Sequence, residues 1–330
     1  MIIQAGVITI LCEHAHSMNP RLRLNAVWAL KHFVNAVTND LKRQCVEELG
    51  QGWLVQLICD DTEDEALLSS REKSDKGVAD EEMDEDVEMD QFEEQVEAAF
   101  AGTFGRSNNS RPSSSRSKSI EQAELRLAAL RDAETNPARK ARKDDIAVQE
   151  QGLSFIRNLI GPTGPGASSE VTEMVDFLFN SLGQERFFEI LASKLRPKVI
   201  NPYNRRNNTE TRVQPPQPEI INAVAMILVH LAASIPRHRQ IVIAQTELLK
   251  LLVPQFHHPN IEIRLSLCHL ATNLAWKDDP SDSKACMQRA KELQGLEFLQ
   301  KLEMLEQDGE LNVRERAKSA VWQMKESLGY

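Results

Sequence analysis

The sequence has few of the features that mark secreted, membrane-spanning or disulfide-bonded proteins. Its five cysteines are widely spaced and form no CxxC pair, and only 5% of its 330 residues are aromatic. We therefore expect neither a disulfide framework nor a zinc ribbon, and a reducing intracellular compartment fits the cysteines best. No run of 18 apolar residues is present, so no membrane span is expected. The first residues have neither the basic region nor the small-residue cleavage site of a signal peptide.

Catalytic motifs are missing as well. The sequence contains no GxGxxG, P-loop, HExxH or GxSxG pattern, which mark dinucleotide, phosphate, zinc-protease and nucleophile sites. His257 and His258 are adjacent, so their side chains point apart on regular structure and are not expected to share a metal. We expect no catalytic residues, no cofactor and no metal ligands, and an enzyme with an unrecognised site remains an alternative.

Negative charge is concentrated in one segment. The formal net charge is −10, but residues 60–97 alone hold 18 Asp and Glu against 3 Lys and Arg. The rest of the chain therefore carries about +5. A block of like charges with few aliphatic residues predicts a solvated, mostly disordered segment rather than a metal site.

The feature that recurs is the apolar stripe of an amphipathic helix. In residues 260–276 apolar side chains follow at i, i+4, i+7, i+8 and i+11, which places them on one face of a helix. Pro259 precedes this helix and Asn260 can cap it. The same frame occurs in five copies, which begin at Leu22, Val148, Ile220, Ile263 and Val313. Five copies of one helix predict a repeat architecture.

In two units of the sequence, the long helix follows two shorter helices. The predicted helices cover 237–244, 247–256 and 260–276, and then 282–292, 296–306 and 311–328. A three-helix unit of about 42 residues has the period of armadillo repeats. We therefore predict an all-α fold, a right-handed superhelical solenoid of about five armadillo repeats with disordered insertions.

Two insertions lengthen loops between helices. The equivalent positions His32, Asn158, His230, Asn273 and Gln323 are separated by 126, 72, 43 and 50 residues. A repeat of about 42 residues leaves roughly 84 extra residues in the second unit and roughly 30 in the third. Loop-closure entropy grows only with the logarithm of length, so such insertions are tolerated. The predicted division is into repeats at 1–59, an acidic then Ser/Arg-rich insertion at 60–143, repeats at 144–195, a polar Pro/Asn-rich insertion at 196–217, and repeats at 218–330.

The candidate functional site is a surface. Stacked long helices place equivalent positions in continuous rows, and one such position is polar in every copy. We call it the polar row: His32, Asn158, His230, Asn273 and Gln323. Four residues earlier in each helix lies the flanking line: Trp28, Ser154, Met226, His269 and Ser319. We predict that both line a concave surface where amides and imidazoles bind the backbone of an extended peptide and Trp28 inserts between its side chains. The alternative is that these groups only bond neighbouring helix ends or loops inside the stack.

Other residues indicate further roles. Arg23, Arg264 and Arg314 recur near the start of long helices, where a positive charge is unfavourable to the helix dipole, so we expect an acidic partner in the adjacent repeat.

Trp276 and Trp322 lie outside the polar row and are assigned to core packing or to a rim. The basic tract at 139–143 fits a nuclear localisation signal or a chance cluster. Residues 110–119 fit a phosphorylated linker or solvated filler.

Three segments resemble a known family: PRLRLNAVWALKHFVN, DDIAVQEQGLSFIRNLIG and NIEIRLSLCHLATNLAWKDD. They are similar to the C-terminal part of the armadillo-repeat scaffold subunit of the GID/CTLH E3 ubiquitin ligase, in a fungal form with long insertions. The resemblance implies a non-catalytic adaptor, in the cytoplasm and nucleus, that links a substrate receptor to the RING and LisH-containing core and promotes proteasome-dependent degradation. Its partners would be proteins, with no nucleic acid and no membrane.

In that family the concave face takes the C-terminal tail of the receptor, which maps here onto the polar row with Trp28 beside it. Two family Asn positions are His32 and His230 in this chain, which departs from a strict peptide ladder. Family members extend further at the N-terminus, and Met1 begins inside a repeat, so we expect a fragment or a truncated chain. The alternative function is a cargo adaptor of the importin-α kind or another armadillo interaction module. The importin-α ladder is richer in Trp, which occupies one of five equivalent positions here.

Overall fold

The structure is a computed structural model of the chain, and it describes residues 6–17, 19–50, 137–161, 168–200 and 212–329. The chain divides into two compact units, one formed by Met1–Asp60 with Asp144–Tyr330 and the other by Asp61–Lys143. Of the second unit only 137–143 are described, and they begin a helix. The predictions for the acidic segment and the Ser/Arg-rich linker, at 60–136, lie outside the described residues.

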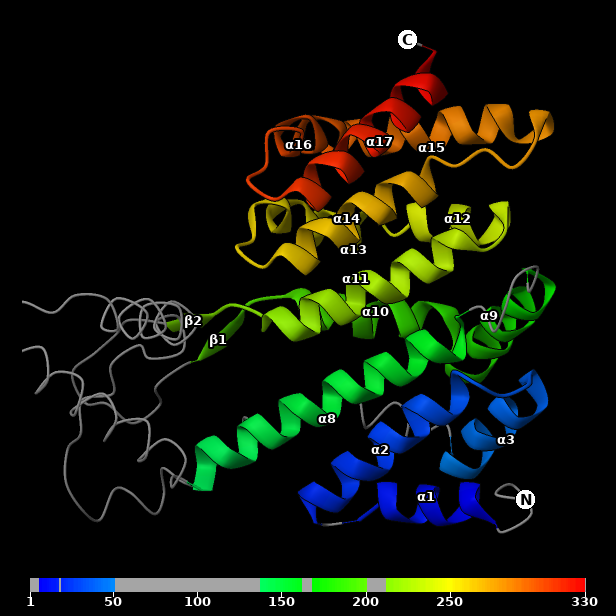
Figure 1. Ribbon diagram of the computed structural model, residues 1–330, viewed down its shortest axis with the longest axis vertical. Helices are drawn as coiled ribbons and strands as arrows, with labels where there is room; N and C mark the ends of the chain where they lie inside the picture. Colours follow the sequence, from blue (N-terminus) through cyan, green and yellow to red (C-terminus); the bar gives the residue numbers. More distant parts are fainter. Residues whose placement is uncertain (1–5, 18, 51–136, 162–167, 201–211, 330) are drawn as a thin grey trace, which may run out of the picture. The chain divides into compact units, whose positions relative to one another are not determined.

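In the third to fifth repeats two helices precede the long helix, as predicted, and one helix is described before each long helix of the first two repeats (Figure 1). The first repeat contains α1 (Val7–Ala15) and the long α2 (Pro20–Val34), and the second contains α3 (Asn39–Leu49) and the long α8 (Pro137–Leu159). The third contains α9 (Ser168–Leu182), α10 (Gln184–Leu195) and the long α11 (Pro218–Ala233). The fourth contains α12 (Pro236–Ile243), α13 (Thr246–Leu252), the 3-10 helix η2 (Val253–His257) and the long α14 (Ile261–Leu274). The fifth contains the 3-10 helix η3 (Pro280–Asp282), α15 (Ser283–Gly295), α16 (Phe298–Leu305) and the long α17 (Leu311–Leu328).

Short-range signals set the ends of the helices. The Asn19 side chain accepts the backbone N–H groups of Arg21 and Leu22, and Pro20 occupies the first position of α2. Asn260 caps α14 in the same way, as predicted, by accepting the N–H of Glu262. These side chains satisfy backbone donors that have no partner inside the helix.

The apolar stripes of the long helices form the core of the stack. α11 packs against α14, and α14 packs against α17, so these helices lie side by side (Figure 1). The stripe positions of α14 are 0% exposed: Ile263, Leu267, Leu270, Ala271 and Leu274. Burying one large aliphatic side chain stabilises the fold by about 1.5–3 kcal/mol relative to leaving it exposed. The all-α solenoid predicted from these stripes is confirmed.

A short β-hairpin lies where the sequence predicted only a polar insertion. β1 (Lys198–Ile200) pairs antiparallel with β2 (Arg212–Gln214), with Val199 opposite Val213. The residues between the two strands, 201–211, are not described.

The helix α8 begins earlier than predicted. It starts at Pro137 and runs for 23 residues, so the basic tract 139–143 lies within its first turns. Proline suits the first position of a helix, and Ala, Arg and Lys are strong helix formers. Despite its length, neither α8 nor any other described helix combines the length and the apolar character needed to cross a membrane.

Candidate protein-interaction surface

The amide side chains of the polar row tie neighbouring long helices together. Each donates to a backbone carbonyl of an earlier long helix or its C-terminal cap. The contacts are Asn158 Nδ2 to Lys31 O and Asn273 Nδ2 to Val229 O, both at 3.0 Å, and Gln323 Nε2 to Ala275 O at 3.1 Å. The polar row therefore takes part in stacking, which is the contact that the alternative interpretation describes.

The acceptor half of these amides differs between repeats. Each amide also carries a carbonyl oxygen that can accept hydrogen bonds. Asn158 Oδ1 accepts from Arg157 Nε at 3.2 Å and from Arg157 Nη2 at 3.1 Å. Asn273 Oδ1 accepts no hydrogen bond from the described part of the chain. Stacking therefore leaves an acceptor available to a peptide at Asn273, but occupies both halves of Asn158.

Two histidines of the surface are neutral at neutral pH. Burial, with Arg157 nearby, lowers the pKa of His230 to about 4. Burial, with Arg316 nearby, also lowers the pKa of His269. A neutral imidazole has one N–H donor and one acceptor nitrogen, so each ring can bond either group of a peptide backbone.

The flanking line is uneven in exposure. Trp28 is 53% exposed, and its ring lies edge-on to that of His32 with the centroids 4.4 Å apart. The two rings therefore form an exposed aromatic pair on α2. Ser154 is only 8% exposed, so of the ten predicted residues it offers the least surface to a partner. The remaining members are the half-buried Met226 and His269 and the exposed Ser319.

A cluster of charged side chains borders the polar row between α2 and α8. Lys31 Nζ donates to Gln151 Oε1 at 2.6 Å. Burial lowers the pKa of both Lys31 and Arg157, while the charge of Glu150 acts in the opposite direction on each. Burial raises the pKa of Glu150 itself, and Glu219 adds to that rise. The cluster thus holds two half-buried cations near one carboxylate whose ionisation is disfavoured.

The arginines near the start of the long helices have partners. Arg264 forms a bidentate ion pair with Asp308 of the next repeat, through Nε at 2.8 Å and Nη2 at 3.1 Å. The predicted acidic partner in the adjacent repeat is therefore found for Arg264. All three arginines also donate to the carbonyl six residues earlier: Arg23 to Ser17, Arg264 to His258 and Arg314 to Asp308.

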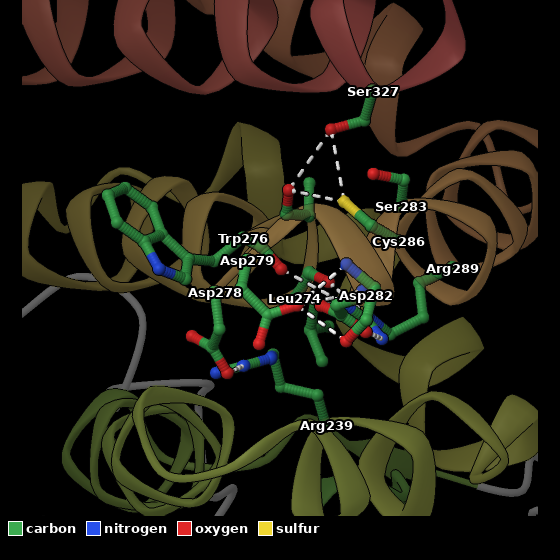
Figure 2. Close-up of polar contacts among 12 residues, drawn as sticks. Arg239, Leu274, Trp276, Asp278, Asp279, Asp282, Ser283, Cys286, Arg289 and Ser327 are labelled. Atoms are coloured by element: carbon green, nitrogen blue, oxygen red, sulfur yellow. Dashed lines mark hydrogen bonds and ion pairs between the residues drawn. The ribbon is translucent and has the colours of Figure 1, made fainter.

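The end of α14 and the WKDD segment meet α15 around a buried ion pair, and we call this contact the junction (Figure 2). Arg289 is fully buried and pairs with Asp282, through Nη1 at 3.2 Å and Nη2 at 2.8 Å. Its Nε donates to Leu274 O at 2.9 Å, and its Nη2 donates to Trp276 O at 2.8 Å. These carbonyls end α14, where the helix dipole is negative and a cation is favourable.

A second buried arginine joins the same segment to the preceding repeat. Arg239 on α12 pairs with Asp278 (Figure 2). Its Nη1 donates to Ala232 O at 3.2 Å and to Ser234 O at 2.8 Å, at the end of α11. Asp279 Oδ1 accepts the N–H groups of Ser281 and Asp282 at the start of η3, so both carboxylates of WKDD have structural tasks. Trp276 is 49% exposed and Trp322 is 64% exposed, which excludes core packing for both and leaves the predicted rim position.

Sequence reasoning missed three of these arginines. Arg239 and Arg289 lie 50 residues apart, the same interval that separates Asn273 from Gln323, so their recurrence was a usable signal. The position of Arg157 holds a cation in one other repeat, where it is Lys31, and uncharged residues occupy it in the last three repeats. Its importance became visible only from its bonds to Asn158.

Known proteins support the armadillo architecture. The sequence profile of the Armadillo/beta-catenin-like repeat matches residues 1–33. A designed armadillo repeat protein in complex with the peptide (KR)4 superposes with a TM-score of 0.52 at 13% sequence identity, covering 98% of this chain and 84% of that one. The chain is thus an α-solenoid with the armadillo fold.

One curated relative points to a multi-subunit complex. The chain is 27% identical over 226 residues to GID complex subunit 5 of Schizosaccharomyces pombe. The match covers 54% of this chain and 25% of that protein, so the chain spans about a quarter of the relative's length. The predicted resemblance to an armadillo-type GID subunit is confirmed at this level.

Proposed function

We propose that this chain is a non-catalytic scaffold that binds an extended segment of a partner protein along the polar row. In this role it links a substrate receptor to the catalytic core of a GID/CTLH-type ubiquitin ligase and so promotes proteasomal degradation in the cytoplasm and nucleus. The observation that carries the proposal is the recurrence of one polar position on all five long helices. The similarity to a GID complex subunit supports the choice of complex.

The proposed binding mode follows from the free hydrogen-bonding groups. Asn273 Oδ1 accepts a peptide N–H, while the neutral rings of His230 and His269 offer either a donor or an acceptor. The exposed pair of Trp28 and His32 supplies apolar contact area at one end. A tryptophan that a partner covers often contributes much of the binding energy of a protein interface, so Trp28 is the expected anchor. The complex of the designed armadillo protein with a peptide is a precedent for the fold.

The direct test is a binding titration with a synthetic peptide. The fluorescein-labelled C-terminal tail of the organism's own GID-type substrate receptor is titrated with the full chain and followed by anisotropy. The paired substitution of His230→Ala and Asn273→Ala is expected to weaken binding by about tenfold or more, since each lost hydrogen bond contributes about 1 kcal/mol. Asn180→Ala on α9, an exposed asparagine away from the row, is the matched control and should bind like the wild type.

Thermal unfolding separates binding from stability in this test. Loss of the Asn273–Val229 bond should lower the melting temperature by only about 2–4 °C. If the paired variant unfolds at much lower temperature, the row is purely structural and the proposal fails. Affinity purification with mass spectrometry then tests the complex: RING and LisH-containing subunits support it, whereas importin-β would favour the cargo-adaptor alternative.

A further inference from the structure

In the second repeat an arginine, Arg157, lies beside the row residue and bonds its amide. Asn158, the row residue of α8, has both halves of its amide occupied, by Lys31 O and by Arg157. Its Oδ1 is therefore fully used, and one Nδ2–H is what it still offers to a peptide backbone. This Oδ1 fixes the guanidinium of Arg157 beside the row. Arg157 also lies close enough to His230 of the next repeat to lower the pKa of that ring.

The Arg157 guanidinium is only partly used within the chain. Of the five N–H donors of a guanidinium, the bonds to Asn158 engage Nε and one on Nη2. Nη1 has no partner among the described residues, and neither Arg157 nor Lys31 has a carboxylate at ion-pair distance there. Both side chains are half-buried. Buried cations in proteins are normally paired, whereas these two share one nearby carboxylate, Glu150, which forms no ion pair with either in the described part of the chain.

We propose that Arg157, with Lys31 beside it, is an anion subsite that binds the side-chain carboxylate of an Asp or Glu within the extended partner segment. This inference rests on the proposed function and adds a sequence preference to it. An arginine held by a neighbouring amide is suited to carboxylates, because its planar fork can donate two parallel hydrogen bonds. The preceding and following rungs are His32 and His230, so the segment continues past Arg157 in both directions. A C-terminal carboxylate would end the segment at the second repeat and leave the rungs on one side of it empty, which favours an internal acidic residue.

The test starts from an unbiased probe. Phage-displayed random decapeptides are selected on the immobilised full chain and, in parallel, on the Arg157→Gln variant. The wild type should enrich Asp or Glu at one position of the selected peptides, and the variant should not. Arg186→Gln, which removes an exposed arginine on α10, is the matched control and should keep the enrichment.

A double-mutant cycle then assigns the contact. One selected acidic peptide is labelled with fluorescein and compared with its Glu→Gln form on both proteins. Either single change should weaken binding by about tenfold, as expected for a charge-assisted pair, and both together should weaken it little further. Because the peptide can be changed without touching the protein, instability of the Arg157→Gln variant does not obscure the result. Arg157→Lys should restore part of the affinity, since it keeps the charge but loses the fork.

Two other outcomes overturn the subsite in different ways. If peptides bind with no acidic preference, and their binding depends on His230 and Asn273, the anion subsite is wrong while the proposed groove stands. If no peptide is selected, or binding is indifferent to the polar row, both the groove and the subsite are wrong.

Discussion

Two groups of cations in the stack have different partners. In the fourth and fifth repeats Arg239, Arg264 and Arg289 each pair with a carboxylate and also bond backbone carbonyls. In the first two repeats Lys31 and Arg157 are half-buried and bond only side-chain amides. The same residue type thus has two kinds of environment: the fully paired arginines stabilise a junction, whereas we propose that the partly paired Arg157 binds a partner.

The largest effect on stability is expected at the buried junction. Arg289→Met leaves Asp282 buried without its cation, which typically costs about 3–5 kcal/mol. Urea unfolding of the full chain, followed by circular dichroism, measures the loss. Lys291→Met, which removes an exposed lysine on the same helix, should change the free energy of unfolding by less than about 0.5 kcal/mol. Similar values for the two variants would remove the contrast between junction and surface.

A smaller effect, visible as a pH dependence, is expected at Asp308. Burial alone would raise the pKa of Asp308, but hydrogen bonds from Arg264 and from the Glu310 N–H outweigh burial and hold it below its usual value. A lowered folded-state pKa contributes stability that is present above the unfolded-state pKa of about 3.9 and is lost as the pH falls through the folded-state value. Urea midpoints measured from pH 6 to pH 2.5 should therefore fall more steeply for the wild type than for Asp308→Asn. Parallel curves would show that the ion pair contributes nothing.

Substitution of Arg157 should affect peptide binding much more than the free energy of unfolding. Arg157→Gln loses two hydrogen bonds to Asn158 but also removes an unpaired, half-buried charge, and these effects oppose each other. The free energy of unfolding should change by less than about 1 kcal/mol, while affinity for the selected acidic peptide falls. A large loss of stability in the same urea titration would show that Arg157, like Arg289, has a structural role.

The smallest effect on stability is expected for the exposed tryptophans. Trp28→Ala and Trp322→Ala should each change the free energy of unfolding by less than about 0.5 kcal/mol, because both rings are largely solvated. Only Trp28→Ala should weaken binding of the receptor tail in the anisotropy assay, since Trp322 lies off the polar row. Equal losses for both would move the binding surface away from the row.

The framework of the fold was predictable because it depends on local patterns. The stripe from Ile263 to Leu274 and the cap at Asn260 act within one helix, and their repetition specifies the solenoid. The start of α8 was missed because the basic tract read as a linker, although Pro137 and the following Ala, Arg and Lys favour a helix. The pairing of β1 with β2 joins two three-residue strands across eleven residues, and no local pattern specifies such a register.

The candidate site was predictable only in part. The polar row was visible as a repeated position, but the sequence does not say which half of each amide the stack uses. Whether Asn158 or Arg157 faces a partner depends on bonds between residues 31, 157 and 158, which belong to two helices. Likewise the WKDD segment looked like a family signature, and the pairing of Asp278 with Arg239 and the bond of Arg289 to Trp276 O assign it to the junction.

Hydrogen–deuterium exchange of the full chain, with and without the receptor tail peptide, tests the central claim most directly. Binding along the polar row should slow exchange in the peptides of α2, α8, α11 and α14, which carry His32, Asn158, His230 and Asn273. It should leave α9, α12 and α15, the first helices of their repeats, unchanged. Protection confined to these first helices, or no protection at saturating peptide, would contradict the account.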